Sequence, residues 1–551
     1  MLSAMPRPPS AEREAPGLES VVRIVLETLG LVLLLMAWRR NLYHLHGPLG
    51  LYDEGILLTN SMLVSRGEVP YRDFYSNYGP GIFVTIAGAW KLLGTSALAG
   101  RLLGFSMHVL LAVGSGLLGG RILGRRFSFL AAGLVAVWLS ALGTFPYAWL
   151  AALALLLACV LALGRAVDAS SRRAFLASGA LLGAASWYRP DLAAYFSLAL
   201  VGASVLASLR SLRSDGRLAR EIRRGGALFL PGALVTALPV WGAAFLLAGR
   251  QVIDDLFLDQ ARYVQPARLL PLPPLAAWLH APDLPVPLPA FLVALEPAAV
   301  AVVSAAALAG ILLAATAGGR RAGSRSAVVI TGALWAAVLP QALGRSDGFH
   351  LIQAVPPSIV LLAALAHRLV EWGRLRALLA AVLVAWLFAP ARHLKPTASL
   401  RWPLSTRDFP RYGGIPEGDP AMLALLGFLA DRTAPGDRIF VGLHDHSRTL
   451  ANAMLVYFLA DRAGGTRNMQ FDPNLTDRES TQRLMIRDLE RSGVRWVVRG
   501  HPLLGYEPNE SRRPGSRALD EHLLRHFAPV ARFGGYEVWQ RVRREGAERG
   551  S

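Results

Sequence analysis

The sequence predicts a polytopic α-helical membrane protein that ends in a separate α/β domain. Apolar residues make up 53% of the 551 residues and charged residues 17%, and the mean hydropathy is +0.38, which is too apolar for a soluble protein of this size. Hydrophobic stretches of roughly 15 to 25 residues, long enough to cross a hydrocarbon core of about 30 Å, recur from position 21 to about position 390. After Pro390 the composition is mixed, and the remaining residues are numerous enough to bury a core of their own.

The chain therefore divides into three regions. Residues 1–20 form a charged, Pro-rich leader, residues 21–390 a transmembrane domain, and residues 391–551 the α/β domain. No convincing small-residue cleavage site accompanies the first span, which predicts an uncleaved signal anchor. We expect about 11 to 13 transmembrane helices. The predicted spans are 21–38, 102–120, 127–143, 145–164, 174–188, 192–209, 226–248, 290–317, 327–343, 352–367 and 376–390.

Arginine clusters in alternate loops predict the orientation of these spans. Cytoplasmic loops carry an excess of Arg and Lys. We therefore expect the leader and these loops on the cytoplasmic side of a cytoplasmic (inner) membrane. The first outer loop 39–101, the loop 249–289 and the α/β domain are then outside. The formal charge of +19 follows from this topology and predicts no nucleic-acid partner. The clusters are Arg121, Arg125 and Arg126; Arg165, Arg172 and Arg173; Arg210 to Arg224; Arg320, Arg321 and Arg325; and Arg368, Arg374 and Arg376.

This alternation depends on one short apolar stretch, Ile82–Gly94, which contains Lys91. A crossing here would place five arginine clusters on the wrong side of the membrane. We therefore predict that the stretch lies at the outer interface or re-enters the membrane from outside. The lone cysteine, Cys159, lies within a predicted span, so the sequence predicts no internal disulfide.

The first outer loop is unusually rich in polar and aromatic residues between Leu51 and Gly81. Asp53 is placed to cap a helix that runs to about Ser65, with Gly67 as its C-terminal stop. Apolar positions of this helix are expected to rest on the membrane surface, as in an interfacial helix. This arrangement would hold the neighbouring carboxylates of Asp53 and Glu54 at the boundary with water.

Each charged group of the loop has a structural and a functional interpretation. Asp53 is a general-base candidate or an N-cap, and Glu54 is a second catalytic candidate or a favourable charge in the first helical turn. Arg72 and Asp73 are substrate-binding candidates or a local surface ion pair.

Two further sites place charges at the outer ends of spans, namely Arg189-Pro190-Asp191 and the run Gly344–His350. An arginine can hold a phosphate in a bidentate fork and a histidine can add a donor, so these sites suit a phosphorylated lipid. The alternative is interfacial snorkelling with a local Arg–Asp pair. The outer loop 249–289 either covers this surface or is a solvated connection.

Several of these motifs resemble the GT-C class of membrane glycosyltransferases, near the protein O-mannosyltransferase and aminoarabinose transferase group (glycosyltransferase family 39-like). The resemblance covers the membrane region and is most specific in the first outer loop. The motifs are Tyr52-Asp53-Glu54-Gly55, Gly67-Glu68-Val69-Pro70-Tyr71-Arg72-Asp73-Phe74, Tyr78-Gly79-Pro80-Gly81, Arg189-Pro190-Asp191, and Arg345-Ser346-Asp347 with His350 and Leu351.

The resemblance implies an enzyme that moves a hexosyl or pentosyl group from a polyprenyl-phosphate donor to a glycan, lipid or protein acceptor in the cell envelope. Asp53 corresponds to the catalytic base of the family, with Glu54 beside it, and inversion at the anomeric carbon is expected. No metal-ligand cluster is evident. The question whether a divalent cation binds near the two carboxylates is left open. The implied substrate-binding residues are Arg72, Asp73, Tyr78, Arg189, Asp191, Arg345, Asp347 and His350.

The α/β domain is predicted from a change of periodicity. Strands are expected at RIFVGL and VRWVVRG, helices around Leu450–Asp461 and Thr481–Ser492, and a final hairpin at ARFGGYEVWQRV. His444-Asp445-His446 suggests a metal or acid/base site, while a loop or helix cap is its simpler interpretation. Acceptor recognition by this domain is a hypothesis that rests on its expected position outside.

Two other functions compete with the glycosyltransferase. A transporter or flippase of lipid-linked saccharides would carry functional charges near the membrane midplane, whereas most charges here lie at outer span ends. We also see no internal repeat of the kind that many transporters have. A non-catalytic membrane anchor for a binding domain would leave the first outer loop unexplained.

Overall fold

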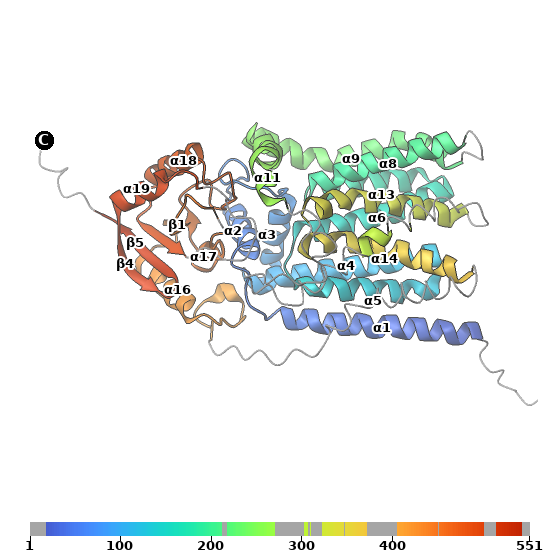
Figure 1. Cartoon of the computed structure of the whole chain (residues 1–551), viewed down its shortest axis with the longest axis horizontal. Helices are drawn as coiled ribbons and strands as arrows, with labels where there is room; N and C mark the ends of the chain where they lie inside the picture. The colour runs from blue at the N-terminus through green and yellow to red at the C-terminus, as the bar shows by residue number, and fades with distance from the viewer. Residues whose placement is uncertain are drawn as a thin grey trace, which may run out of the picture.

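The computed structural model describes residues 18–211, 217–269, 302–306, 309, 322–345, 348–371, 405–449, 451–500 and 514–542. Long helices form a bundle, and the α/β domain lies at one end of it, with the short helices α2 and α3 between the two (Figure 1). The predicted fold class, a polytopic helical membrane protein with a C-terminal α/β domain, is confirmed.

The helices of the bundle coincide with the predicted spans in the described part of the chain. Among the described residues, five segments are long and apolar enough to cross a membrane, namely Ala97–Leu123, Arg125–Leu142, Ala148–Ala169, Arg224–Ala248 and Ser326–Gly344. Predicted span 376–390 and most of 290–317 lie outside the described residues. The bundle helices are α1 (Leu18–His44), α4 (Ala97–Leu123), α5 (Ser128–Leu139, flanked by 3₁₀ turns Arg125–Phe127 and Ser140–Leu142), α6 (Ala148–Ala169), α7 (Arg172–Ser186), α8 (Pro190–Ser211), α9 (Arg217–Ala248), α13 (Ala322–Gly344) and α14 (Gly348–Glu371).

Small residues let bundle helices approach each other closely. A Cβ atom at Gly179 of α7 would lie 1.9 Å from the carbonyl oxygen of Phe229 in α9, so only glycine fits at this crossing. Such contacts replace the hydrophobic drive that is missing between helices in lipid.

Helix α2 (Asp53–Ser65) has the predicted bounds but neither the predicted cap nor the predicted surroundings. Its N-cap residue is Tyr52, whose side chain makes no capping hydrogen bond, and Asp53 is the first residue of the helix. Positions 54 to 63 are all buried, polar ones included. The apolar positions Ile56, Leu57 and Leu63 are at most 1% exposed. The expectation that they rest on the membrane surface, as in an interfacial helix, is therefore wrong, because they pack inside the protein.

Helix α3 (Gly81–Leu93) does not cross the bundle. It has 13 residues, which span only about 20 Å at 1.5 Å per residue. Its first residue donates a backbone hydrogen bond to Trp187, at the end of α7 (2.9 Å). Near its other end, Trp90 stacks on Phe458 of the α/β domain with ring centroids 5.3 Å apart. Both ends of α3 thus lie on the side of the bundle that faces the α/β domain (Figure 1).

The α/β domain is built on a five-stranded sheet with the order β2-β1-β3-β5-β4. β1 pairs in parallel with β2 and β3, and β5 pairs antiparallel with β3 and β4. Both predicted strands, the helix at Thr481–Ser492 and the hairpin are present, whereas the helix predicted at Leu450–Asp461 is shorter. The elements are the 3₁₀ turn Pro410–Tyr412, α16 (Pro420–Arg432), β1 (Arg438–Leu443), α17 (Leu455–Leu459), β2 (Ala463–Gly464), α18 (Glu479–Arg491), β3 (Trp496–Gly500), α19 (Ala518–His526), β4 (Phe527–Phe533) and β5 (Tyr536–Arg541).

A segment after α9 joins the end of the bundle to the α/β domain. It runs through α10 (Gln251–Ile253), the π-helical turns η3 (Asp254–Leu258) and η4 (Gln260–Val264), and α11 (Gln265–Arg268). Asp255 is 1% exposed and pairs with Arg467 of the α/β domain at 2.7 Å. This segment, α2 and the loop after β2 form the seam between the two domains, and Asp53 and Glu54 begin α2 there.

Candidate functional site

Asp53 begins α2 at the seam and is half-buried. The helix dipole favours a carboxylate at this position. The charges near Asp53 also act on the pKa of the Tyr78 hydroxyl. Burial raises its pKa well above the usual value, the charges of Asp53 and Asp472 raise it further, and those of Arg268 and Arg189 lower it. One carboxylate of the first loop, one of the α/β domain and two arginines therefore lie within electrostatic range of this hydroxyl, which stays protonated at neutral pH.

Glu54 is held in a buried ion pair rather than directed at this group. Its side chain is 0% exposed, and its two oxygens accept hydrogen bonds from Arg101 at 2.6 and 2.9 Å. The backbone N–H of Gly50 adds a third at 2.7 Å. Arg101 also donates to the carbonyl oxygens of the turn before α2, for example Gly47 at 2.7 Å. These contacts favour the structural interpretation of Glu54, as the residue that fixes the entry to α2, over its expected role as a second catalytic carboxylate.

Arg72 and Asp73 form the local surface pair that was the alternative to substrate binding. Two hydrogen bonds of 2.9 and 2.7 Å join their side chains, which are 50% and 30% exposed. The hydrogen bonds from Arg72 hold the pKa of Asp73 below its usual value. The same carboxylate accepts the N–H of Val69 at 2.7 Å and so closes its own turn.

The backbone of the same loop brings Tyr78 back toward the seam. Tyr71 has a left-handed conformation (φ 69°), which is costly for a bulky residue and needs support from its surroundings. Arg467 of the α/β domain donates to the Tyr71 carbonyl oxygen at 2.6 Å. The Tyr71 hydroxyl donates to the carbonyl oxygen of Tyr78 at 2.8 Å. The α/β domain therefore supports the loop conformation that places Tyr78.

Arg189 and Asp191 form a bidentate pair with hydrogen bonds of 2.9 and 2.6 Å. Gln341 of α13 donates to the same carboxylate and ties α8 to α13. Arg189 is 16% exposed and acts electrostatically on Tyr78. The backbone N–H of Gly79 donates to the carbonyl oxygen of Tyr188 at 3.3 Å, so Arg189 lies beside the segment that carries Tyr78, with Asp191 as the residue that orients it.

Arg345 lies at the end of α13 and is 8% exposed. Its Nη1 atom donates to the carbonyl oxygen of Arg268 at 3.4 Å, which links it to the same group. His350 is half-buried in the first turn of α14. Asp347 lies outside the described residues.

Sequence reasoning missed two residues of this group, Arg268 and Asp472. The Asp472 side chain is 0% exposed, and its Oδ1 atom lies 3.3 Å from Nη1 of Arg268. The loop 249–289 was predicted either to cover this surface or to be a solvated connection, and polar residues alternate with apolar ones in NMQFD at 468–472. That alternation in a region with no predicted strand was the only available signal, because the two residues are 204 positions apart.

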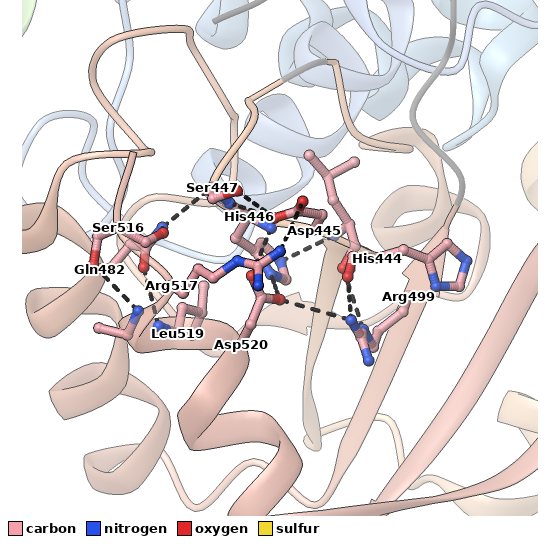
Figure 2. Close-up of polar contacts among 12 residues, drawn as sticks. His444, Asp445, His446, Ser447, Gln482, Arg499, Ser516, Arg517, Leu519 and Asp520 are labelled. Carbon is pink, nitrogen blue, oxygen red and sulfur yellow. Dashed lines mark hydrogen bonds and ion pairs between the residues drawn. The ribbon is translucent and has the colours of Figure 1, made fainter. Parts of the chain in front are cut away.

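His444-Asp445-His446 belongs to a separate network inside the α/β domain, shown in Figure 2. Nδ1 of His446 lies 2.6 Å from Oδ1 of Asp520, and its Nε2 accepts the N–H of Leu443 at 3.0 Å. Both ring nitrogens are therefore engaged, with the proton on Nδ1. Gln482 of α18 donates to the His446 carbonyl oxygen at 2.9 Å. The network joins the loop after β1 to α18 and α19, which favours the structural interpretation of the motif.

An open cavity of about 600 Å³ lies on the seam beside η4. The Arg478 guanidinium stacks 3.8 Å above the Tyr263 ring at its wall. Among the described residues, no three His, Cys, Asp or Glu side chains come together as metal ligands. The cavity is lined by Arg262, Tyr263, Asn474, Asp477, Arg478, Glu479, Gly515 and Ser516.

No protein-family model matches the sequence, and no curated protein matches it significantly. Solved structures do match. The structure of ArnT from Cupriavidus metallidurans bound to undecaprenyl phosphate is 14% identical with a TM-score of 0.51, over 96% of this chain and 99% of that one. The apo ArnT structure is 15% identical (TM-score 0.47; 94% and 97%). The Archaeoglobus fulgidus oligosaccharyltransferase in complex with zinc and sulfate is 13% identical (TM-score 0.44; 85% and 68%).

The ArnT match extends over nearly the whole of both chains, the α/β domain included. It confirms, for the fold, the resemblance that the first outer loop suggested. This chain is a multi-pass membrane protein with the GT-C glycosyltransferase fold.

Proposed function

We propose that the chain is a glycosyltransferase that moves a monosaccharide from a polyprenyl-phosphate donor to an acceptor outside the cytoplasmic membrane. The observation that carries this proposal is the position of Asp53. It starts α2 at the seam and is half-buried. It directly follows Tyr52, whose hydroxyl lies 3.5 Å from Oδ1 of Asp472, the carboxylate that pairs with Arg268. A carboxylate beside fixed cations is what a displacement with an anionic leaving group requires.

In the proposed step, an acceptor hydroxyl or amine attacks the anomeric carbon of the donor. Its proton passes to the Asp53 carboxylate, and the bond from the anomeric carbon to the phosphate oxygen breaks with its electron pair on the phosphate. Attack opposite the leaving group inverts the anomeric centre. A positioned base contributes typically about 10²–10⁴-fold to such a reaction.

The leaving polyprenyl phosphate gains charge as the bond breaks, and the arginines are proposed to stabilise it. Arg189 and Arg268 are both in electrostatic range of Tyr78, and Arg345 contacts the backbone of Arg268. Guanidinium groups suit phosphate because they donate in a planar fork. The protonated hydroxyl of Tyr78 can add a donor, as can His350, while Asp191 orients Arg189.

The remaining predicted substrate residues take lesser parts in this proposal. Asp347 is kept as a substrate residue because it lies between Arg345 and His350 in the sequence. Arg72 and Asp73 serve the structure of the loop. A divalent cation at Asp53 would have to do without Glu54, whose two oxygens face Arg101.

The fold also supports the proposed side and donor. The α/β domain and the seam lie together at one end of the bundle (Figure 1), which we place outside an inner membrane with the N-terminus in the cytoplasm. The ArnT neighbour was crystallised with undecaprenyl phosphate, which supports a polyprenyl phosphate as the sugar carrier here. The acceptor is then a glycan, lipid or protein of the cell envelope.

The decisive experiment is Asp53→Asn in the full-length protein. We expect sugar transfer to fall by about 10²–10⁴-fold while membrane abundance stays normal, because the amide keeps the shape of the side chain but cannot accept the proton. The measurement compares surface glycans of cells that carry the wild type, the variant or neither. The matched control is Asp254→Asn, since this carboxylate of η3 pairs with the exposed side chain of Arg250 at 3.3 Å. Undiminished transfer by Asp53→Asn would reject the base, and movement of lipid-linked saccharide without any transfer would favour the flippase.

A further inference from the structure

A loop of the α/β domain reaches the residue immediately before Asp53. The hydroxyl of Tyr52, the N-cap residue of α2, donates a hydrogen bond to the carbonyl oxygen of Phe471. The same hydroxyl lies 3.5 Å from Oδ1 of Asp472. Tyr52 is 2% exposed, so this contact is sealed from solvent. The start of α2 is thus attached to a residue 419 positions away.

Asp472 is a buried charge with polar contacts to both domains. Gln470 donates to its Oδ2 atom at 2.8 Å, and Arg268 lies 3.3 Å from its Oδ1 atom. Its carbonyl oxygen accepts the N–H of Thr476 at 3.1 Å, which closes a turn around it. A buried carboxylate is costly unless it is paired and hydrogen-bonded. These contacts therefore fix both Asp472 and the arginine that it faces.

A second attachment holds the same turn of α2 through the backbone. The N–H of Leu455 donates to the carbonyl oxygen of Leu51 at 2.9 Å. A Cβ atom at Gly55 would lie 2.4 Å from the nitrogen of Leu455, so this approach requires glycine. With two attachments to one rigid domain, the first turn of α2 has little freedom to rotate.

We propose that Asp472 is a positioning residue for the transfer reaction. It orients Asp53 through Tyr52 and fixes the guanidinium of Arg268, so that the α/β domain completes the catalytic site. This inference rests on the proposed function, and it differs from the hypothesis that the α/β domain only recognises the acceptor. Catalysis is sensitive to such placement, because a shift of about 1 Å in a catalytic group can cost about 10²-fold in rate.

The test compares Asp472→Asn with Asp461→Asn in the full-length protein. Asp461 also belongs to the α/β domain and pairs across the seam with Arg66, but Arg66 is the C-cap residue of α2, at the end away from Asp53. Asparagine also tolerates the left-handed backbone at position 461 (φ 58°).

We expect Asp472→Asn to lower kcat by about 10- to 100-fold and to change KM for the polyprenyl-phosphate sugar by less than about threefold. Asp461→Asn should leave both constants within about twofold. Tyr52→Phe, which removes one hydroxyl and little else, should lower kcat in the same direction. Equal losses in Asp472→Asn and Asp461→Asn would overturn the inference, because they would indicate general undocking of the domain.

Amide hydrogen exchange tests the positioning without reference to sugar transfer. In the wild type, the N–H groups of Gly55 and Ile56 donate to Gly50 and Tyr52 at 3.1 and 2.7 Å. Asp472→Asn should speed exchange at positions 53–57 and leave positions 62–67 unchanged, and Asp461→Asn should do the reverse. Unchanged exchange at positions 53–57 in Asp472→Asn would overturn the inference whatever the transfer assay shows. A wild type that transfers no sugar would instead count against the proposed function.

Discussion

The two halves of the first outer loop carry similar residues in different surroundings. In each half, charged residues stand beside tyrosines. At the start of α2, Tyr52 and Glu54 are almost completely buried between the bundle and the α/β domain. In the turn that follows, the Arg72 and Asp73 side chains are 50% and 30% exposed and pair with each other. The tyrosines of this turn are nevertheless buried, Tyr71 at 0% and Tyr75 at 2% exposure. The two halves therefore differ in the exposure of their charged groups, and a charged pair indicates a buried anchor only where the rest of the chain encloses it.

The largest expected effect lies in the buried half. Glu54→Gln leaves Arg101, which is 1% exposed, as a buried charge without its carboxylate. Breaking one partner of a buried pair costs about 3–5 kcal/mol, so we expect a strong loss of folded protein. The measurement is thermal unfolding and yield of the detergent-solubilised protein. If the yield and the melting temperature are unchanged, the pair is not the anchor of the turn before α2.

An intermediate effect is expected for the proposed phosphate group. Arg345→Ala should lower sugar transfer by about 10²-fold, the magnitude typical of removing one group that stabilises developing charge, with less effect on stability than Glu54→Gln. Transfer kinetics with a polyprenyl-phosphate sugar measure it. Arg345→Lys keeps the charge but loses the planar fork and should recover only part of the activity. Full activity of the alanine variant would remove Arg345 from the proposed phosphate site.

The smallest effect is expected for the exposed pair of Arg72 and Asp73. Asp73→Asn disrupts an exposed pair, and such pairs contribute little to stability. We expect a shift in melting temperature below about 2 °C and transfer within about twofold of the wild type. A loss of transfer comparable to that of Arg345→Ala would restore Arg72 and Asp73 as substrate-binding residues and would end the contrast between the two halves.

Sequence patterns predicted local structure well. Hydrophobic length placed the spans within a few residues, as at α4, where 102–120 was predicted and Ala97–Leu123 is observed. Arginine placement predicted that Ile82–Gly94 does not cross the membrane, which stays a prediction, and α3 forms a 13-residue helix there. Stop signals gave the bounds of α2, because they depend only on neighbouring residues.

The contacts across the seam were beyond sequence reasoning. The burial of α2 depends on Leu455 and its neighbours, and Asp472 reaches Tyr52 across 420 positions. No periodicity encodes such pairings, since they follow from how two domains dock. The same holds for Glu54, whose partner Arg101 lies at the start of a different helix, 47 positions away.

The attachment between Tyr52 and Phe471 also bears on biogenesis. Ribosomes add about 5–20 residues per second, so the 419 positions that separate these residues correspond to about 20 to 80 s of synthesis. Positions 54 to 63 of α2 are buried in the finished protein. During that interval α2 lacks the contacts that the α/β domain makes with it. The catalytic centre that we propose can form only after the α/β domain has been made and has docked, so a chain truncated before this domain that inserts normally would be inactive.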